Sequence, residues 1–143
     1  MMFSKSHVVA LVRAAAGLTT VLTTPAMAVE RPPRPNVDAL PVSVNSTREQ
    51  LMLGDRIFHG EAARGTCFQC HGWDGKGTAT GNDLTNGSLN WGESFAQIKA
   101  TILNNMKLAP GQDGDLTPAD VDAVTAYVWA LVHQERMENQ VAR

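Results

Sequence analysis

The two cysteines of the chain lie in the run Cys67-Phe68-Gln69-Cys70-His71, which has the pattern C-x-x-C-H. This pattern is typical of covalent attachment of a c-type haem. Two thiols at this spacing can each form a thioether with a haem vinyl group, and the adjacent histidine can ligate the iron. The sequence therefore predicts that Cys67 and Cys70 bind one haem c covalently and that His71 is the proximal iron ligand.

Cysteine pairs at this spacing also occur in zinc sites and redox-active dithiols. A zinc site needs four protein ligands, but the next histidine after His71 is His133, far outside zinc-finger spacing. His7 lies in a segment expected to be removed, and His59 would have to fold back alone. A redox dithiol would need a βαβ pattern, and no convincing strand surrounds the cysteines. Haem attachment is favoured, with zinc and dithiol chemistry as alternatives.

Residues 1–28 have the pattern of a secretory signal peptide. Lys5 and Arg13 make the beginning basic, a small apolar stretch follows, and an A-x-A cleavage site ends at Ala28. We expect a mature chain from Val29 that is exported to the periplasm, with a retained N-terminal anchor as the alternative. No later segment has the roughly 20 apolar residues of a membrane span.

Removal of this segment would leave 10 basic and 14 acidic residues, a formal charge of −4. The absence of a basic patch argues against nucleic acid as a partner. The length suits one small domain, and we expect folding to depend on the apolar haem. Residues 29–45 contain four prolines and are expected to form an extended, solvated arm, with docking on a partner as the alternative. Residues 46–137 would form the domain and 138–143 a tail.

Three helices are expected in this domain. Ser46 and Glu49 form a predicted capping box for a helix over residues 47–59. Gly54 inside it costs about 1 kcal/mol against alanine, which a close helix–helix contact would explain. Further helices are predicted after Ser94, with Gln97 completing a second box, and after Thr117, with Pro118 at the first helical position. The last helix is expected to fray beyond about Met137.

The glycine-rich stretch 72–92 is long for a free loop in a small domain. It suits a chain that wraps around a cofactor. Its apolar anchors would be Trp73, Leu84, Leu89 and Trp91.

Over residues 46–137 the chain resembles the class I cytochrome c family. Three motifs carry the resemblance: Gly54-x-x-x-Phe58 before the C-x-x-C-H run, Trp73-Asp74-Gly75-Lys76-Gly77 after it, and Leu116-Thr117-Pro118-Ala119-Asp120-Val121 ahead of Ala126-Tyr127-Val128. The resemblance implies an all-α fold of three to four short helices around one covalent haem. It also implies contacts of Gly54 and Phe58 with Tyr127 and Val128.

The sequence departs from the family pattern in two places. Gly81-Asn82-Asp83-Leu84 stands where the family usually has Gly-Pro-x-Leu, whose proline carbonyl accepts the ring N–H of the proximal histidine. A different backbone carbonyl can still accept that bond. The family's axial methionine often directly precedes a proline, but Ala109 precedes Pro110 here.

Met106, three residues earlier, is the favoured distal iron ligand, and an apolar residue that ends a helix is the alternative. The other candidates are disfavoured: Met52 as a core residue, Met137 as part of a frayed end, His59 and His133 as surface or helix-end residues, and Lys107 because of its high pKa.

Three functions stay open. The favoured one is an electron carrier, not an enzyme, between a periplasmic dehydrogenase or membrane complex and a terminal acceptor. The resemblance extends to small periplasmic cytochromes that serve dehydrogenases and oxidases. The alternatives are a haem protein with an open or labile distal site, and a cytochrome subunit bound tightly to a dehydrogenase.

Overall fold

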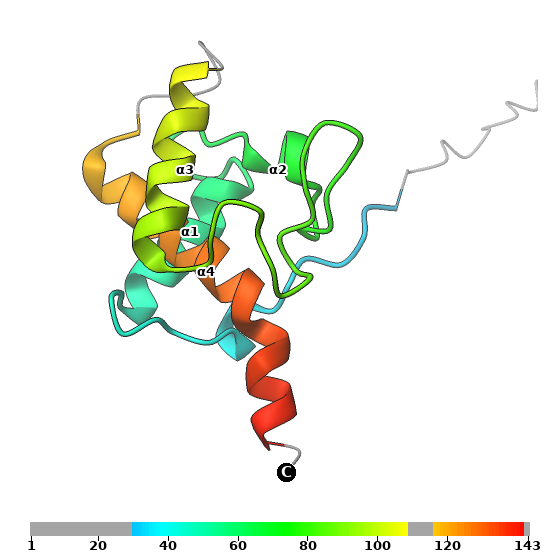
Figure 1. The fold of residues 1–143 in the computed structure, drawn as a ribbon. Helices are drawn as coiled ribbons and strands as arrows, with labels where there is room; N and C mark the ends of the chain where they lie inside the picture. Colours follow the sequence, from blue (N-terminus) through cyan, green and yellow to red (C-terminus); the bar gives the residue numbers. More distant parts are fainter. Residues whose placement is uncertain (1–29, 109–115, 142–143) are drawn as a thin grey trace, which may run out of the picture.

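The computed structural model describes residues 30–108 and 116–141, without the side chains of residues 106–108 and 136–141. The expected signal peptide lies outside these residues. The elements are the short 3-10 helix η1 (Val37–Ala39) and the helices α1 (Arg48–Phe58), α2 (Cys67–His71), α3 (Phe95–Leu108) and α4 (Pro118–Val141). The described ranges contain no strand, so the predicted all-α fold is confirmed (Figure 1). None of their helices is long and apolar enough to cross a membrane.

α1 crosses α4 at Gly54, and this contact forms the centre of the fold (Figure 1). A Cβ atom at Gly54 would overlap the carbonyl of Ala123 and lie 2.9 Å from the Cβ of Tyr127. One turn further on, the rings of Phe58 and Tyr127 pack with their centroids 5.3 Å apart. Val128 belongs to the same buried cluster. The expected close approach at Gly54 is confirmed, and a side chain there would separate the helices.

The first helix is capped one residue later than predicted. The Thr47 hydroxyl accepts a hydrogen bond from the Gln50 N–H at 3.2 Å, and the Gln50 side-chain oxygen accepts one from the Thr47 N–H at 3.0 Å. Ser46 instead donates its N–H and its hydroxyl to the Ser43 carbonyl. The predicted box of Ser46 and Glu49 is therefore wrong, because Ser46 closes the preceding turn.

The other two helix starts agree with the sequence. The Ser94 hydroxyl accepts a hydrogen bond from the Gln97 N–H at 3.3 Å. The Thr117 hydroxyl accepts one from the Asp120 N–H at 3.2 Å, and the Asp120 carboxylate accepts one from the Thr117 N–H at 2.9 Å. α4 continues to Val141, beyond the end predicted near Met137.

The proline-rich segment packs on the helical domain from Arg31 onward, where the guanidinium lies over the Trp73 ring. The Arg34 guanidinium binds the Asp55 carboxylate on α1, and Leu40 is buried. The Arg48 side chain donates to the carbonyls of Val37 and Leu40, both at 3.0 Å. The expected solvated arm is therefore wrong for this part of the segment, because its arginine and its backbone carbonyls find partners on α1.

Candidate functional site

A tight turn sets α2 against the end of α1. Ala63 and Arg64 have φ angles of 47° and 52°, in the left-handed region that side chains rarely adopt. A Cβ atom at Gly65 would overlap the carbonyl of Ile57. The turn therefore needs a glycine at this point, and it brings both cysteines and His71 to the edge of the core.

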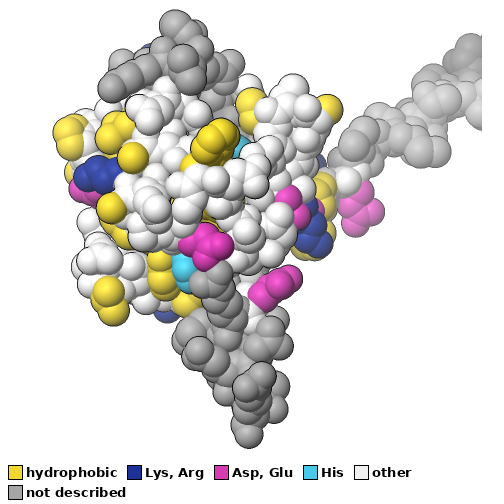
Figure 2. All heavy atoms as spheres, in the orientation of Figure 1, with side chains coloured by type: hydrophobic (Ala, Val, Ile, Leu, Met, Phe, Trp, Pro, Cys, Tyr) yellow, Lys and Arg dark blue, Asp and Glu magenta, His cyan; other side chains and the backbone are white. Residues whose placement is uncertain are grey.

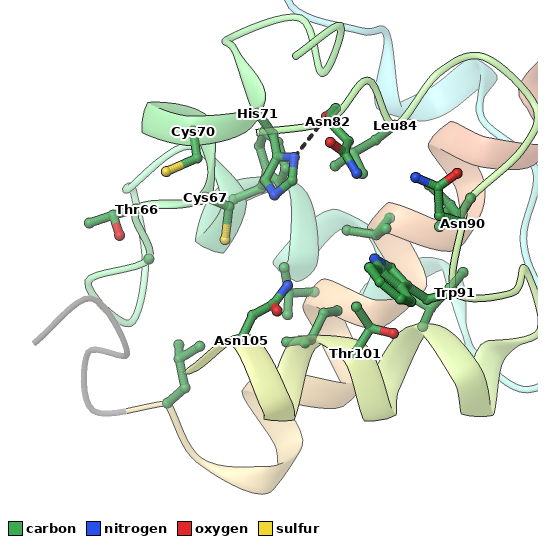
Figure 3. A pocket seen from close by; sticks show the side chains of 18 of the residues that line it. Thr66, Cys67, Cys70, His71, Asn82, Leu84, Asn90, Trp91, Thr101 and Asn105 are labelled. Carbon is green, nitrogen blue, oxygen red and sulfur yellow. Dashed lines mark hydrogen bonds between the residues drawn. The ribbon is translucent and has the colours of Figure 1, made fainter. Parts of the chain in front are cut away.

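A cavity of about 260 Å³ lies beside α2 (Figure 3). Apolar side chains from three helices and the glycine-rich loop form most of its wall: Phe58, Leu84, Leu89, Ile98, Val124 and Val128. None of the described residues that line it is Asp, Glu, Lys or Arg. The lining suits a large apolar ligand.

His71 presents its ring to this cavity (Figure 3). Its Nδ1 donates a hydrogen bond to the backbone carbonyl of Asn82, with an N–O distance of 2.8 Å. A ring whose Nδ1 carries the proton keeps the Nε2 lone pair for a metal. The prediction that another carbonyl can replace the usual proline carbonyl is confirmed.

The loop reaches His71 because Gly81 allows it to approach α2 closely. A Cβ atom at Gly81 would overlap the Cys70 carbonyl. The same carbonyl accepts a hydrogen bond from the Thr78 hydroxyl at 2.5 Å, and the His71 carbonyl accepts one from the Gly77 N–H at 2.8 Å. These contacts hold the Asn82 carbonyl beside the imidazole.

Cys67 and Cys70 both line the cavity and form no disulfide with each other. Burial raises the pKa of the Cys67 thiol to about 11, whereas redox-active dithiols depend on a lowered thiol pKa. Within residues 30–108 and 116–141 no three His, Cys, Asp or Glu side chains lie together as a metal site would require. Neither the dithiol nor the zinc alternative finds support.

Three of the four expected apolar anchors line the cavity, namely Leu84, Leu89 and Trp91. Trp91 is nevertheless 68% exposed. Trp73 does not line the cavity, so this part of the prediction is wrong. Its ring packs on His59, with centroids 4.7 Å apart, and on Phe68, with centroids 5.4 Å apart.

The structure places three of the disfavoured ligand candidates. His59 lies at the end of α1, as expected, and is buried. Met52 is 45% exposed, so its interpretation as a core residue is wrong. His133 stacks on Trp129 within α4, with ring centroids 4.0 Å apart.

The backbone of Met106 lies in the last turn of α3, while its side chain and the whole of Ala109 and Pro110 lie outside the described residues. The side chains of Lys107 and Met137 lie outside them as well. Thr101 and Asn105 do line the cavity from α3, across from His71 (Figure 3). Sequence reasoning missed both, although their four-residue spacing places them on one face of the helix.

The family description "Cytochrome c" matches residues 52–131, more than half of the chain. The chain belongs to the cytochrome c family. No curated protein and no solved structure gives a match. Membership implies covalently bound haem c and the electron-transfer role general to cytochromes c. The side chains that would hold haem c in this cytochrome c fit it, because two free thiols and an imidazole with an available Nε2 meet at an apolar cavity.

Proposed function

We propose that this cytochrome c is a periplasmic one-electron carrier with a single haem c. Bound haem supplies a couple between ferric and ferrous iron. The observation that carries the proposal is the apolar cavity in which His71 is fixed through Nδ1. Apart from His71 and the two cysteines, none of its described lining residues has a titratable side chain, so no acid–base pair for bond chemistry is present among those other residues.

In this proposal Cys67 and Cys70 bind the haem through thioethers, and Nε2 of His71 ligates the iron. The Asn82 carbonyl holds the imidazole in one tautomer and one orientation, which also raises the basicity of the ligand. A rigid ligand needs little rearrangement when the iron changes charge, and rapid electron transfer requires such rigidity.

Met106 is the proposed distal ligand. The sequence places it one residue after Asn105, which lines the cavity from α3. A thioether ligand from Met106, together with the histidine, would raise the haem potential and would close the iron to small molecules.

The proposed partners are redox proteins, namely a periplasmic dehydrogenase or membrane complex as donor and a terminal oxidase or similar protein as acceptor. On the face shown in Figure 2, charged side chains are few, and hydrophobic side chains reach the surface in several places. Trp91 adds an exposed ring beside the cavity. Such a surface suits a brief, weakly polar encounter. The signal-peptide pattern of residues 1–28 supports export.

The test is the absorption spectrum of the haem-loaded protein, ferric and ferrous, with and without carbon monoxide. We expect a low-spin spectrum with a weak ferric sulfur-to-iron band, which Met106→Ala abolishes. Met52→Ala is the matched control, because Met52 lies exposed on α1 and does not line the cavity. A high-spin ferric spectrum with fast carbon monoxide binding would contradict the proposal and favour small-ligand chemistry at an open distal site.

A further inference from the structure

His59 is a buried histidine whose two ring nitrogens both face oxygen acceptors. Nδ1 lies 2.8 Å from the Asp55 carbonyl oxygen and 3.1 Å from the Asp55 carboxylate. Nε2 lies 2.8 Å from the Trp73 carbonyl oxygen. A neutral imidazole carries one N–H, so it can satisfy only one side of this arrangement. The geometry therefore fits the positively charged ring, which donates from both nitrogens.

Arg34 binds the same carboxylate from the other side. Its Nε and one terminal nitrogen contact the two Asp55 oxygens at 2.9 and 2.5 Å, while the other terminal nitrogen contacts Glu61 at 2.6 Å. Forked contacts of this kind are among the stronger ionic hydrogen bonds in proteins. Asp55 thus joins the segment before α1 to His59, and His59 joins α1 to the loop that follows His71.

We propose that Arg34, Asp55 and His59 form a proton-dependent clasp, which fastens the segment before α1 and the loop after His71 to α1 while His59 is positively charged. Loss of the ring proton leaves one N–H for acceptors on both sides, so either the Trp73 carbonyl or Asp55 loses its hydrogen bond from His59. Trp73 lies in the loop whose Asn82 carbonyl accepts from His71, so opening of the clasp loosens the support of that imidazole.

The groups that face His59 favour the charged ring. Burial lowers the pKa of His59, but the hydrogen bonds with Asp55 and with the Trp73 carbonyl outweigh burial, and the pKa is raised despite the nearby Arg34 charge. From α4, the Tyr127 ring packs 5.8 Å from the imidazole. Burial raises the pKa of Tyr127, so this phenol stays neutral.

The sign of the pH dependence follows from these shifts. The raised His59 pKa gives stability that is fully present below the unfolded value of about 6.5 and is lost as the pH rises through the folded value. For Asp55, burial is outweighed by the bonds with His59 and Arg34, so the pKa is lowered. Its stabilisation is lost only as the pH falls through that lowered value. The clasp is therefore closed from mildly acidic pH up to the folded pKa of His59.

The experiment is an NMR titration of the histidine side chains in the reduced, haem-loaded protein. We expect the His59 midpoint to lie above the ordinary histidine pKa of about 6.5, and the signals of the Trp73 indole and the Leu40 methyls to shift with that midpoint. Asp55→Asn should lower that midpoint by about one pH unit, because an opposite charge is removed. Arg34→Met should raise the His59 midpoint, because a like charge is removed. This second variant provides the test if Asp55→Asn fails to fold.

Two results would overturn the clasp. In one, His59 titrates at or below the ordinary histidine pKa of about 6.5. In the other, the NMR signals of Trp73 and Leu40 do not change at the pH of the His59 midpoint. His59 would then be a buried residue that holds neither segment in place.

Discussion

The fixed orientation of His71 depends on a glycine and a backbone carbonyl. Gly81 brings the loop against Cys70, and Asn82 offers only its carbonyl oxygen to the imidazole. Because a carbonyl is common to every residue, the usual proline can be replaced at this position without loss of the hydrogen bond. In contrast, substitution of Gly81 would prevent the close approach of the loop to Cys70.

We expect Gly81→Ala to move the Asn82 carbonyl away from His71 and to destabilise the protein by about 2 kcal/mol, since the new methyl overlaps the Cys70 carbonyl. The measurements are chemical unfolding and the ferrous visible spectrum of the haem-loaded protein. Gly87→Ala in the same loop is the control: its φ of 76° adds a backbone strain that Gly81 does not have, but its Cβ would be 4.0 Å from the nearest atom, so it should leave the spectrum unchanged. Equal spectral effects in the two variants would contradict this account.

At the scale of elements, the crossing of α1 and α4 decides how the helices surround the cavity. Phe58 and Val128 line that cavity from the two helices, and an ion pair between Lys99 and Asp122 joins α3 to α4. The distance between α1 and α4 therefore sets both core packing and cavity shape. Gly54 is the residue that permits the short distance.

Gly54→Ala should destabilise the haem-loaded protein by about 3 kcal/mol, although alanine is the better helix former, because the methyl overlaps the Ala123 carbonyl. The measurement is the free energy of chemical unfolding. Met52→Ala, on an exposed part of the same helix, should change it by no more than about 0.5 kcal/mol. A neutral or stabilising Gly54→Ala would show that the helices are further apart than described.

The register of the α1 cap gives a second prediction at this scale. Thr47→Ala should cost about 1 kcal/mol, because it removes the acceptor for the Gln50 N–H. Ser46→Ala should cost less, because its hydroxyl only adds a 3.3 Å bond to a carbonyl that the Ser46 N–H already contacts. Thermal unfolding of both variants decides the matter, and the reverse order would restore the cap first predicted at Ser46.

For the whole molecule, pH should act on stability through the contacts between distant segments. The free energy of unfolding should fall as the pH rises through the His59 pKa, because the unfolded chain loses its histidine proton at a lower pH than the folded one. His59→Gln should flatten this slope. His133→Gln should keep it, since His133 bonds only to the carbonyl of Trp129 on its own helix. Denaturant titrations over a pH series provide the measurement, and identical slopes in both variants would count against His59 as the titrating group.

The chain's sequence by itself determined the features that depend on neighbours along the chain. Local spacing was enough to recognise the C-x-x-C-H motif, to predict the caps at Ser94 and Thr117, and to predict the helical class. Each of these features is built from residues within one or two helical turns of one another. A close helix contact at Gly54 was also predicted, because a glycine inside a helix is costly without one, and the family resemblance implied Tyr127 and Val128 as its partners.

Only the tertiary structure decided which distant groups meet. Arg34 and Asp55 are 21 positions apart, and their pairing turned an expected solvated arm into a packed segment. Trp73 could cover the cavity or pack on His59, and burial of His59 against the Trp73 carbonyl selects the second. Composition shows which groups can bond or be buried. Several distant groups could occupy the same buried positions, and only the complete fold decides which of them do.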